Sequence, residues 1–102
     1  MLKVVSIECQ SPMILKCTFA TGVVKWLNVA PLLQNHSHLK GIETLWNASV
    51  FNQARVGEVG EVLWPSIIHS EDPVHGPIVW DYDISPEFIF AEGQSERLPT
   101  LG

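Results

Sequence analysis

Two histidines and two acidic residues gather within a short proline-rich stretch, at His69, Glu71, Asp72 and His75. Imidazole and carboxylate groups suit zinc and similar divalent ions, so these side chains form a candidate metal site. Their spacing matches no standard site, and it favours the alternative of a solvated polar loop. We therefore predict no cofactor and no metal, with His69, Asp72 and His75 as the residues that a metal hypothesis would use.

A second acidic group, formed by Asp81, Asp83 and Glu87, precedes and opens a predicted helix. It lacks the repeated oxygen ligands and the central glycine of a calcium loop, so helix capping and surface charge explain it. His36 and His38 could transfer a proton only beside a nucleophile or an acid, which the sequence does not nominate. We expect both histidines to be exposed.

The sequence contains no nucleophile elbow, no Walker loop, no dinucleotide fingerprint and no Cys-x-x-Cys pair. Its two cysteines, Cys9 and Cys17, lie on the two strands of a predicted hairpin. Pairing of Cys9 with Ile14, and of Cys17 with Ser6, would place the two thiols on opposite faces, where no disulfide can form. We predict free thiols and a protein that is not an enzyme.

Composition predicts one folded domain in the cytoplasm. The chain has 102 residues, 46% of them hydrophobic and 17% charged, which is too apolar for disorder. No run approaches the roughly 18 apolar residues of a membrane span. Glu8 interrupts the stretch in which a signal peptide would have its apolar segment. We predict a single domain over residues 1–93 and a flexible tail over residues 94–102.

The elements that must position any site are of a mixed α+β class. The predicted order is a three-stranded antiparallel meander, a short helix, a second β-hairpin and a short C-terminal helix. The predicted ranges are strands 3–9, 13–20 and 23–28, helix 29–34, irregular helix within 39–50, strands 51–56 and 61–64, and a helix from 86 to about 91. Asn28 and Ser85 are the predicted N-caps, and residues 66–80 are predicted to be a loop insertion.

Pairing in the meander predicts two faces. Val4, Leu15, Cys17, Phe19, Val24 and Trp26 are expected to face the core. Val5, Ile7 and Ile14 are expected together on the other face, as an apolar surface that a partner or another segment of the same chain covers. Among the four tryptophans, two or three are expected in the core, and Trp80 is predicted to be an exposed binding residue because it borders the loop.

Charge is distributed unevenly. Residues 1–56 hold five Lys or Arg against two Asp or Glu, whereas residues 57–102 hold one against nine. Only six basic residues are present, which is too few for the basic stripe that a phosphate backbone requires. The sequence therefore predicts a protein partner, a basic one, and no nucleic-acid or membrane binding by this domain alone.

The order of the elements resembles a bacterial family known as domain of unknown function 2442. The likeness is carried by Phe19-Ala20-Thr21-Gly22, Leu32-Leu33, the Phe51-x-x-Ala54-x-Val56 segment, Gly60-Glu61-Val62-Leu63-Trp64-Pro65 and Asp83-Ile84-Ser85-Pro86-Glu87. In that family the last two motifs lie close together, whereas residues 66–80 separate them here.

The resemblance implies a compact α+β domain and supplies no catalytic residues. Some members are fused to a helix-turn-helix, and some are encoded beside a second small domain in the manner of toxin–antitoxin pairs. The resulting hypothesis is an interaction module of the antitoxin-like kind. The alternative is a homo-oligomeric structural or small-ligand-binding domain, in which the Val5, Ile7 and Ile14 face pairs with its own copy.

Overall fold

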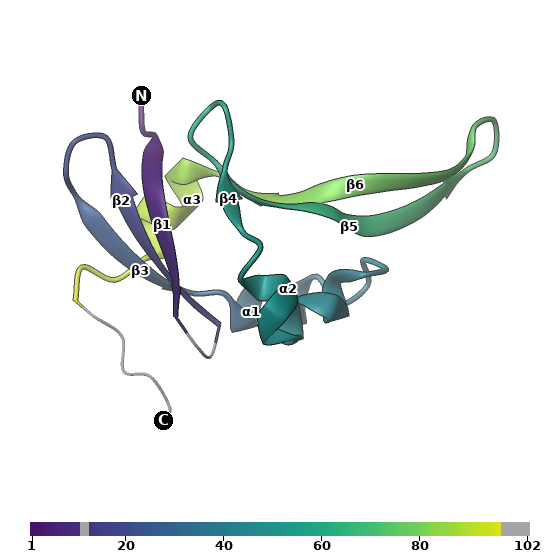
Figure 1. The fold of residues 1–102 in the computed structure, drawn as a ribbon, viewed down its shortest axis with the longest axis horizontal. Helices are drawn as coiled ribbons and strands as arrows, with labels where there is room; N and C mark the ends of the chain where they lie inside the picture. The colour runs from purple at the N-terminus through teal and green to yellow at the C-terminus, as the bar shows by residue number, and fades with distance from the viewer. Residues whose placement is uncertain (11–12, 97–102) are drawn as a thin grey trace.

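The computed structural model describes residues 1–10 and 13–96, which form two three-stranded antiparallel sheets with short helices between and after them (Figure 1). The mixed α+β class is confirmed. The elements in chain order are β1 Val4–Gln10, β2 Ile14–Phe19, β3 Val24–Asn28, α1 Ala30–Asn35, the 3₁₀ helix η1 Ile42–Trp46, α2 Ala48–Phe51, β4 Arg55–Val56, β5 Val62–Asp72, β6 Gly76–Ile84 and α3 Pro86–Glu92.

The first sheet has the order β1-β2-β3, so the predicted meander is confirmed. Gly22 turns the chain between β2 and β3 with φ +91°, a conformation that glycine adopts without a steric penalty. The other predicted turn, at residues 11–12, lies outside the described residues. Among the described residues, no helix has both the length and the apolar character needed to cross a membrane.

The predicted register between β1 and β2 holds at Val4, which lies opposite Phe19, but is wrong by one residue from Ser6 to Gln10. Ile7 pairs with Cys17 and Cys9 pairs with Leu15, because the pairing shifts between Val4 and Ser6. A shift of one residue exchanges the two faces of a strand. The thiols of Cys9 and Cys17 therefore share a face. They are diagonal neighbours, typically about 7–8 Å apart, which is too far for a disulfide, and both are free.

The faces of β3 also differ from the prediction. Trp26 pairs with Lys16 on the face away from the core, and Leu27 pairs with Leu15 on the core face. Among the tryptophans of the described residues, Trp64 alone is buried, so the expectation of two or three in the core is wrong.

Local signals predict the helix boundaries well. The Ser85 hydroxyl accepts a hydrogen bond from the Phe88 N–H at 3.1 Å, and α3 ends at Glu92 before Gly93, as expected. The N-cap predicted at Asn28 is wrong by one residue, because Val29 occupies the N-cap position of α1, but the Asn28 side chain still accepts a hydrogen bond from the Ala30 N–H at 3.0 Å. Residues 39–50 form η1 and the start of α2, which confirms irregular helix there.

The second hairpin differs in two ways from the prediction. Phe51 belongs to α2, so the strand predicted over residues 51–56 is limited to Arg55–Val56, which pairs with Val62 and Leu63. The loop predicted over residues 66–80 is wrong, because those residues complete β5 and open β6. The three prolines that favoured a loop lie at a register irregularity, in the turn and on an edge strand, where a strand pair tolerates proline.

Gln94, the first residue of the predicted tail, pairs with β3 and so does not belong to a tail. Gln94 exchanges two backbone hydrogen bonds with Trp26, each 2.8 Å long, and so extends the open edge of β3. Residues 97–102 of the predicted tail lie outside the described residues.

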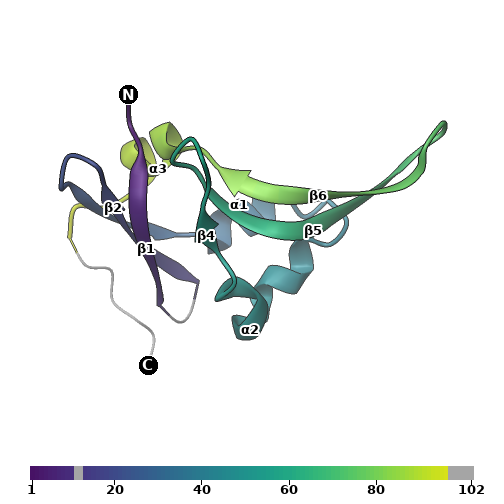
Figure 2. The same ribbon diagram turned by 45° about the horizontal axis from the view of Figure 1, so that its top comes forward.

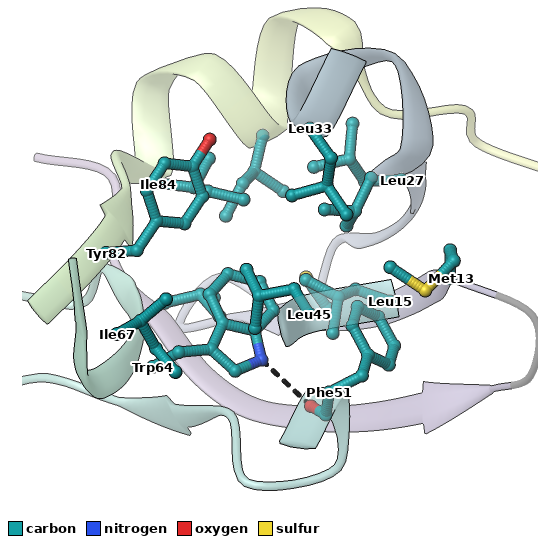
Figure 3. Close-up of a cluster of buried hydrophobic side chains, with 14 of the residues drawn as sticks. Met13, Leu15, Leu27, Leu33, Leu45, Phe51, Trp64, Ile67, Tyr82 and Ile84 are labelled. Atoms are coloured by element: carbon teal, nitrogen blue, oxygen red, sulfur yellow. Dashed lines mark hydrogen bonds between the residues drawn. The ribbon is translucent and has the colours of Figure 1, made fainter. Parts of the chain in front are cut away.

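The centre of the core is Trp64, which is fully buried between the sheets and the helices (Figure 3). Its indole N–H donates to the Phe51 carbonyl oxygen at 2.8 Å. The indole also packs against the Phe51 and Tyr82 rings, with centroids 5.7 and 5.9 Å away. The residue therefore joins β5, α2 and β6.

Replacing Trp64 with phenylalanine should lower the free energy of unfolding by about 2–4 kcal/mol. The change removes the donor to a buried carbonyl and leaves a cavity. Urea unfolding followed by circular dichroism measures it. The control is Trp46→Phe, because Trp46 is 48% exposed and should change stability by less than about 0.5 kcal/mol. Equal losses in the two variants would contradict the central role of Trp64.

The two cysteines should react slowly with a disulfide reagent in the folded protein. Burial, and to a lesser degree the neighbouring Cys9, raise the pKa of Cys17 to about 12, and burial raises the pKa of Cys9. The reactive thiolate is therefore scarce at neutral pH. Thiol labelling with and without urea measures this, and a Cys9→Ser variant should leave Cys17 unlabelled until the protein unfolds. Rapid labelling of that variant without urea would show that Cys17 is accessible.

Candidate functional site

The hairpin of β5 and β6, residues 62–84, projects from the rest of the molecule; we call it the arm (Figures 1 and 2). Its root is anchored, since Val62, Trp64, Tyr82 and Ile84 are buried in the core. Its outer part extends beyond the helices and gives the molecule a longest dimension of 45 Å. A rigid root with an exposed outer part can reach into the surface of another molecule.

Two large apolar side chains are exposed on β6 in the outer part of the arm. Trp80 is 54% exposed and Val79 is 50% exposed. The Trp80 indole N–H donates to the Ser70 hydroxyl at 2.7 Å across the hairpin, which fixes the orientation of the ring. Trp80 lies opposite Ile68 in the register. An oriented, exposed indole is typical of a residue that anchors an interface.

Val79 and Trp80 are consecutive residues of a strand and so lie on opposite faces of the arm, which is otherwise acidic. The arm contains no lysine or arginine, and its four carboxylates belong to Glu71, Asp72, Asp81 and Asp83. The Asp81 carboxylate accepts a hydrogen bond from the Ser66 N–H at 2.9 Å and so caps the irregular part of β5. The surface is therefore negative as well as apolar.

The structure does not bring the candidate metal ligands together. His75 and Asp72 meet in the turn, where the His75 Nδ1 lies 3.3 Å from an Asp72 carboxylate oxygen. His69 lies back along β5, opposite Val79, and its backbone N–H donates to the Lys40 carbonyl oxygen at 2.9 Å. No group of three or more histidine, cysteine, aspartate or glutamate side chains within residues 1–10 and 13–96 is arranged to hold a metal ion.

His36 does not lie in an exposed loop as expected. It is half-buried, and its Nδ1 lies 2.8 Å from the Tyr82 hydroxyl oxygen, which links the end of α1 to β6. Burial raises the pKa of Tyr82, so the hydroxyl keeps its proton. His38 is exposed, as predicted, with its ring 6.2 Å from that of His36. The contact closes the root of the arm against the helical layer.

The expected apolar surface of Val5, Ile7 and Ile14 does not exist as one face. Ile7 packs against the core, because of the register shift described above. Val5 is 57% exposed at the irregularity, and Ile14 is buried on the face away from the core. Their role in binding stays a prediction for each residue separately.

Ile14 instead lines a groove of about 740 Å³. The groove lies between the outer face of the first sheet and two helices, with Trp26, Pro31, Leu32 and Phe88 among its walls. Its lining is largely apolar, and neither its volume nor its walls could be predicted from the sequence, since they depend on how α1 and α3 meet β3.

The sequence contains a signal for the arm that the prolines obscured. Apolar Ile78, Trp80, Tyr82 and Ile84 alternate with the residues between them, which is the period of a strand with one buried face. Trp80 was predicted to be exposed at a binding surface, and its exposure is confirmed, although it lies on a strand and not beside a loop.

A comparison with protein-family models, with curated proteins and with solved structures finds no match for this chain. Membership of the family that the sequence resembles therefore stays a prediction.

The turn of the arm should become less stable at acidic pH, because Asp72 becomes protonated. Its carboxylate accepts hydrogen bonds from the Val74 and His75 N–H groups at 2.7 and 3.2 Å and pairs with the His75 ring. These contacts lower the pKa of Asp72, the Val74 hydrogen bond being the largest cause. Because the pKa of Asp72 is lower in the folded protein than in the unfolded chain, its contacts stabilise the turn fully at a pH above the unfolded-state pKa. This stabilisation is lost as the pH falls through the folded-state pKa.

NMR measures this by following the Asp72 carboxyl carbon and the exchange of the Val74 amide against pH. The carboxyl should titrate below its ordinary value, and the amide should exchange faster after it does. Asp72→Asn is the control, because its side chain has an acceptor oxygen without a titrating group. An Asp72 that titrates at or above its ordinary value would contradict the turn geometry.

Proposed function

We propose that the protein is an interaction module whose arm binds a partner protein, and that it is not an enzyme. The observation that carries the proposal is the exposed, oriented Trp80 on a hairpin that projects from a core to which it is firmly anchored. Tryptophan is strongly enriched among the residues that dominate binding energy. An exposed tryptophan on an acidic hairpin favours a partner that is apolar where it meets the indole and basic around it.

An antitoxin-like half of a two-protein system, acting in the cytoplasm, is the particular form that we propose for this module. Such a subunit covers a surface of its partner and needs complementary charge, without catalytic chemistry of its own. The support is the acidic arm, together with the family resemblance of the sequence. The proposal includes no direct binding to nucleic acid or to a membrane.

A small-ligand-binding role is the second candidate. The apolar groove beside Ile14 and Trp26 favours it, because pockets of about 300–1,000 Å³ with mainly apolar walls are typical of small-molecule sites. Under this alternative, binding would depend on the walls of the groove and not on the arm.

Affinity capture from the source organism, compared between two variants, separates these functions. The tagged protein should retain one specific partner. Trp80→Ala should weaken its purified complex about 30-fold, a typical loss for a tryptophan at the centre of an interface. Trp46→Ala is the matched control, since Trp46 is also about half exposed but lies on η1, and its complex should be unchanged.

Equal binding by both variants would refute the arm as the interaction surface. A Leu32→Asp variant, which alters a wall of the groove, should leave capture intact under the proposed function. Selective loss in that variant, with its circular dichroism spectrum unchanged, would favour the groove.

A further inference from the structure

The outer edge of β6 differs from the other strand edges of the described chain. The edges of β1, β3 and β5 each have a backbone partner outside their own hairpin, and β4, the remaining edge, is only two residues long. On β1, the Val4 N–H donates to the Gly60 carbonyl oxygen. On β3, Trp26 exchanges two backbone hydrogen bonds with Gln94. On β5, the His69 N–H donates to the Lys40 carbonyl oxygen. Within the described residues, β6 exchanges backbone hydrogen bonds with β5 alone and ends the sheet order β4-β5-β6. It therefore offers a free row of N–H and C=O groups.

This edge has few of the features that normally prevent strand addition. Edge strands are commonly protected by bulges, lysines, prolines or a short length. β6 has nine residues, and the register irregularity between Trp64 and Ile68 places the extra residues on β5, so β6 itself runs without a break. Pro77, next to the turn, is its one proline, and β6 contains no lysine.

The two faces of β6 have different chemistry. Side chains alternate along a strand, so Ile78 and Trp80 share one face, while Asp81 and Asp83 share the other face with Val79. A strand added beside β6 places its own alternate side chains on these same two faces. The best-matched strand therefore has apolar residues next to Trp80 and basic residues next to Asp83, and the Asp81 carboxylate, which also caps Ser66 on β5, adds negative charge to the same face.

We propose that an extended basic segment of the partner protein, in which Lys or Arg alternates with apolar residues, pairs with the outer edge of β6. It would add a fourth strand to the β4-β5-β6 sheet, a known mode of peptide recognition. This inference depends on the proposed function and names the partner's chemistry. A second copy of the chain is a poorer occupant, since the arm has no lysine or arginine and two arms would bring carboxylates together.

Synthetic peptides test the charge and the alternation on the unaltered protein. The probe is an acetylated and amidated peptide of alternating lysine and valine. One control is its block isomer, with all lysines before all valines, which has the same charge and composition. The other control is the alternating peptide with N-methyl groups on its consecutive central residues, which cannot pair through either edge. Isothermal titration should show binding of the alternating peptide, and both controls should bind about tenfold more weakly or worse.

Amide exchange identifies the edge. In a strand, successive residues direct their N–H groups to opposite sides, so every second amide of β6 faces outward. Adding the alternating peptide should slow exchange at these alternate amides of β6 and leave the others unchanged. Attraction between side chains alone would not produce that period of two.

The outcomes separate the inference from the proposed function. Equal affinity for the block isomer or the N-methylated peptide, the absence of binding, or the lack of alternate protection on β6 would each overturn strand addition. Light scattering could show that the protein is a dimer, and every second amide of β6 could exchange slowly without any peptide. That result would assign the edge to a second copy of the chain and would also overturn strand addition by a partner. If strand addition fails while capture still depends on Trp80, the arm binds through side chains and the proposed function stands.

Discussion

The hydrogen bond from the Trp64 indole to the Phe51 carbonyl oxygen is the contact on which the arrangement of the two sheets depends. The same carbonyl lies 3.6 Å from the Cys9 Sγ, so one acceptor connects β5 and β1 through α2. A buried acceptor without its donor is costly, and an indole inserted between elements cannot be accommodated if they separate. One core therefore includes residues of both sheets, and the arm is fixed in direction because β5 begins and β6 ends inside that core.

This anchoring divides the hairpin into two parts with different tasks. At the root, Tyr82 and Ile84 are buried, and the Tyr82 hydroxyl contacts His36. Further out, the same strand has exposed apolar side chains and meets no third strand within the described residues. Exposed backbone groups on a flexible segment would lose much conformational entropy on binding. A strand that is already extended and paired on one side loses less, so the fixed root contributes to affinity at the exposed end.

Local signals in the sequence predict local structure, and tertiary contacts decide the rest. Ser85 and Gly93 mark the ends of α3 because capping depends on neighbouring residues alone. The register of β1 could not be predicted, because its shift near Val5 accompanies a bond from Val4 to Gly60 that lies far away in the sequence. Within the candidate site, the exposure of Trp80 was predicted from its surroundings. Its place on an open edge was not, since the prolines at positions 73 and 77 indicated a loop.

The acidic residues of the arm explain how an open strand edge can persist. An unprotected edge invites pairing with further copies, and natural proteins oppose this with charge as well as with bulges. Asp81 and Asp83 put like charges where two arms would meet in an edge-to-edge pair, which disfavours self-association. The same carboxylates attract a strand of opposite charge. A single set of residues therefore excludes one occupant and selects another, and specificity of this kind requires both effects.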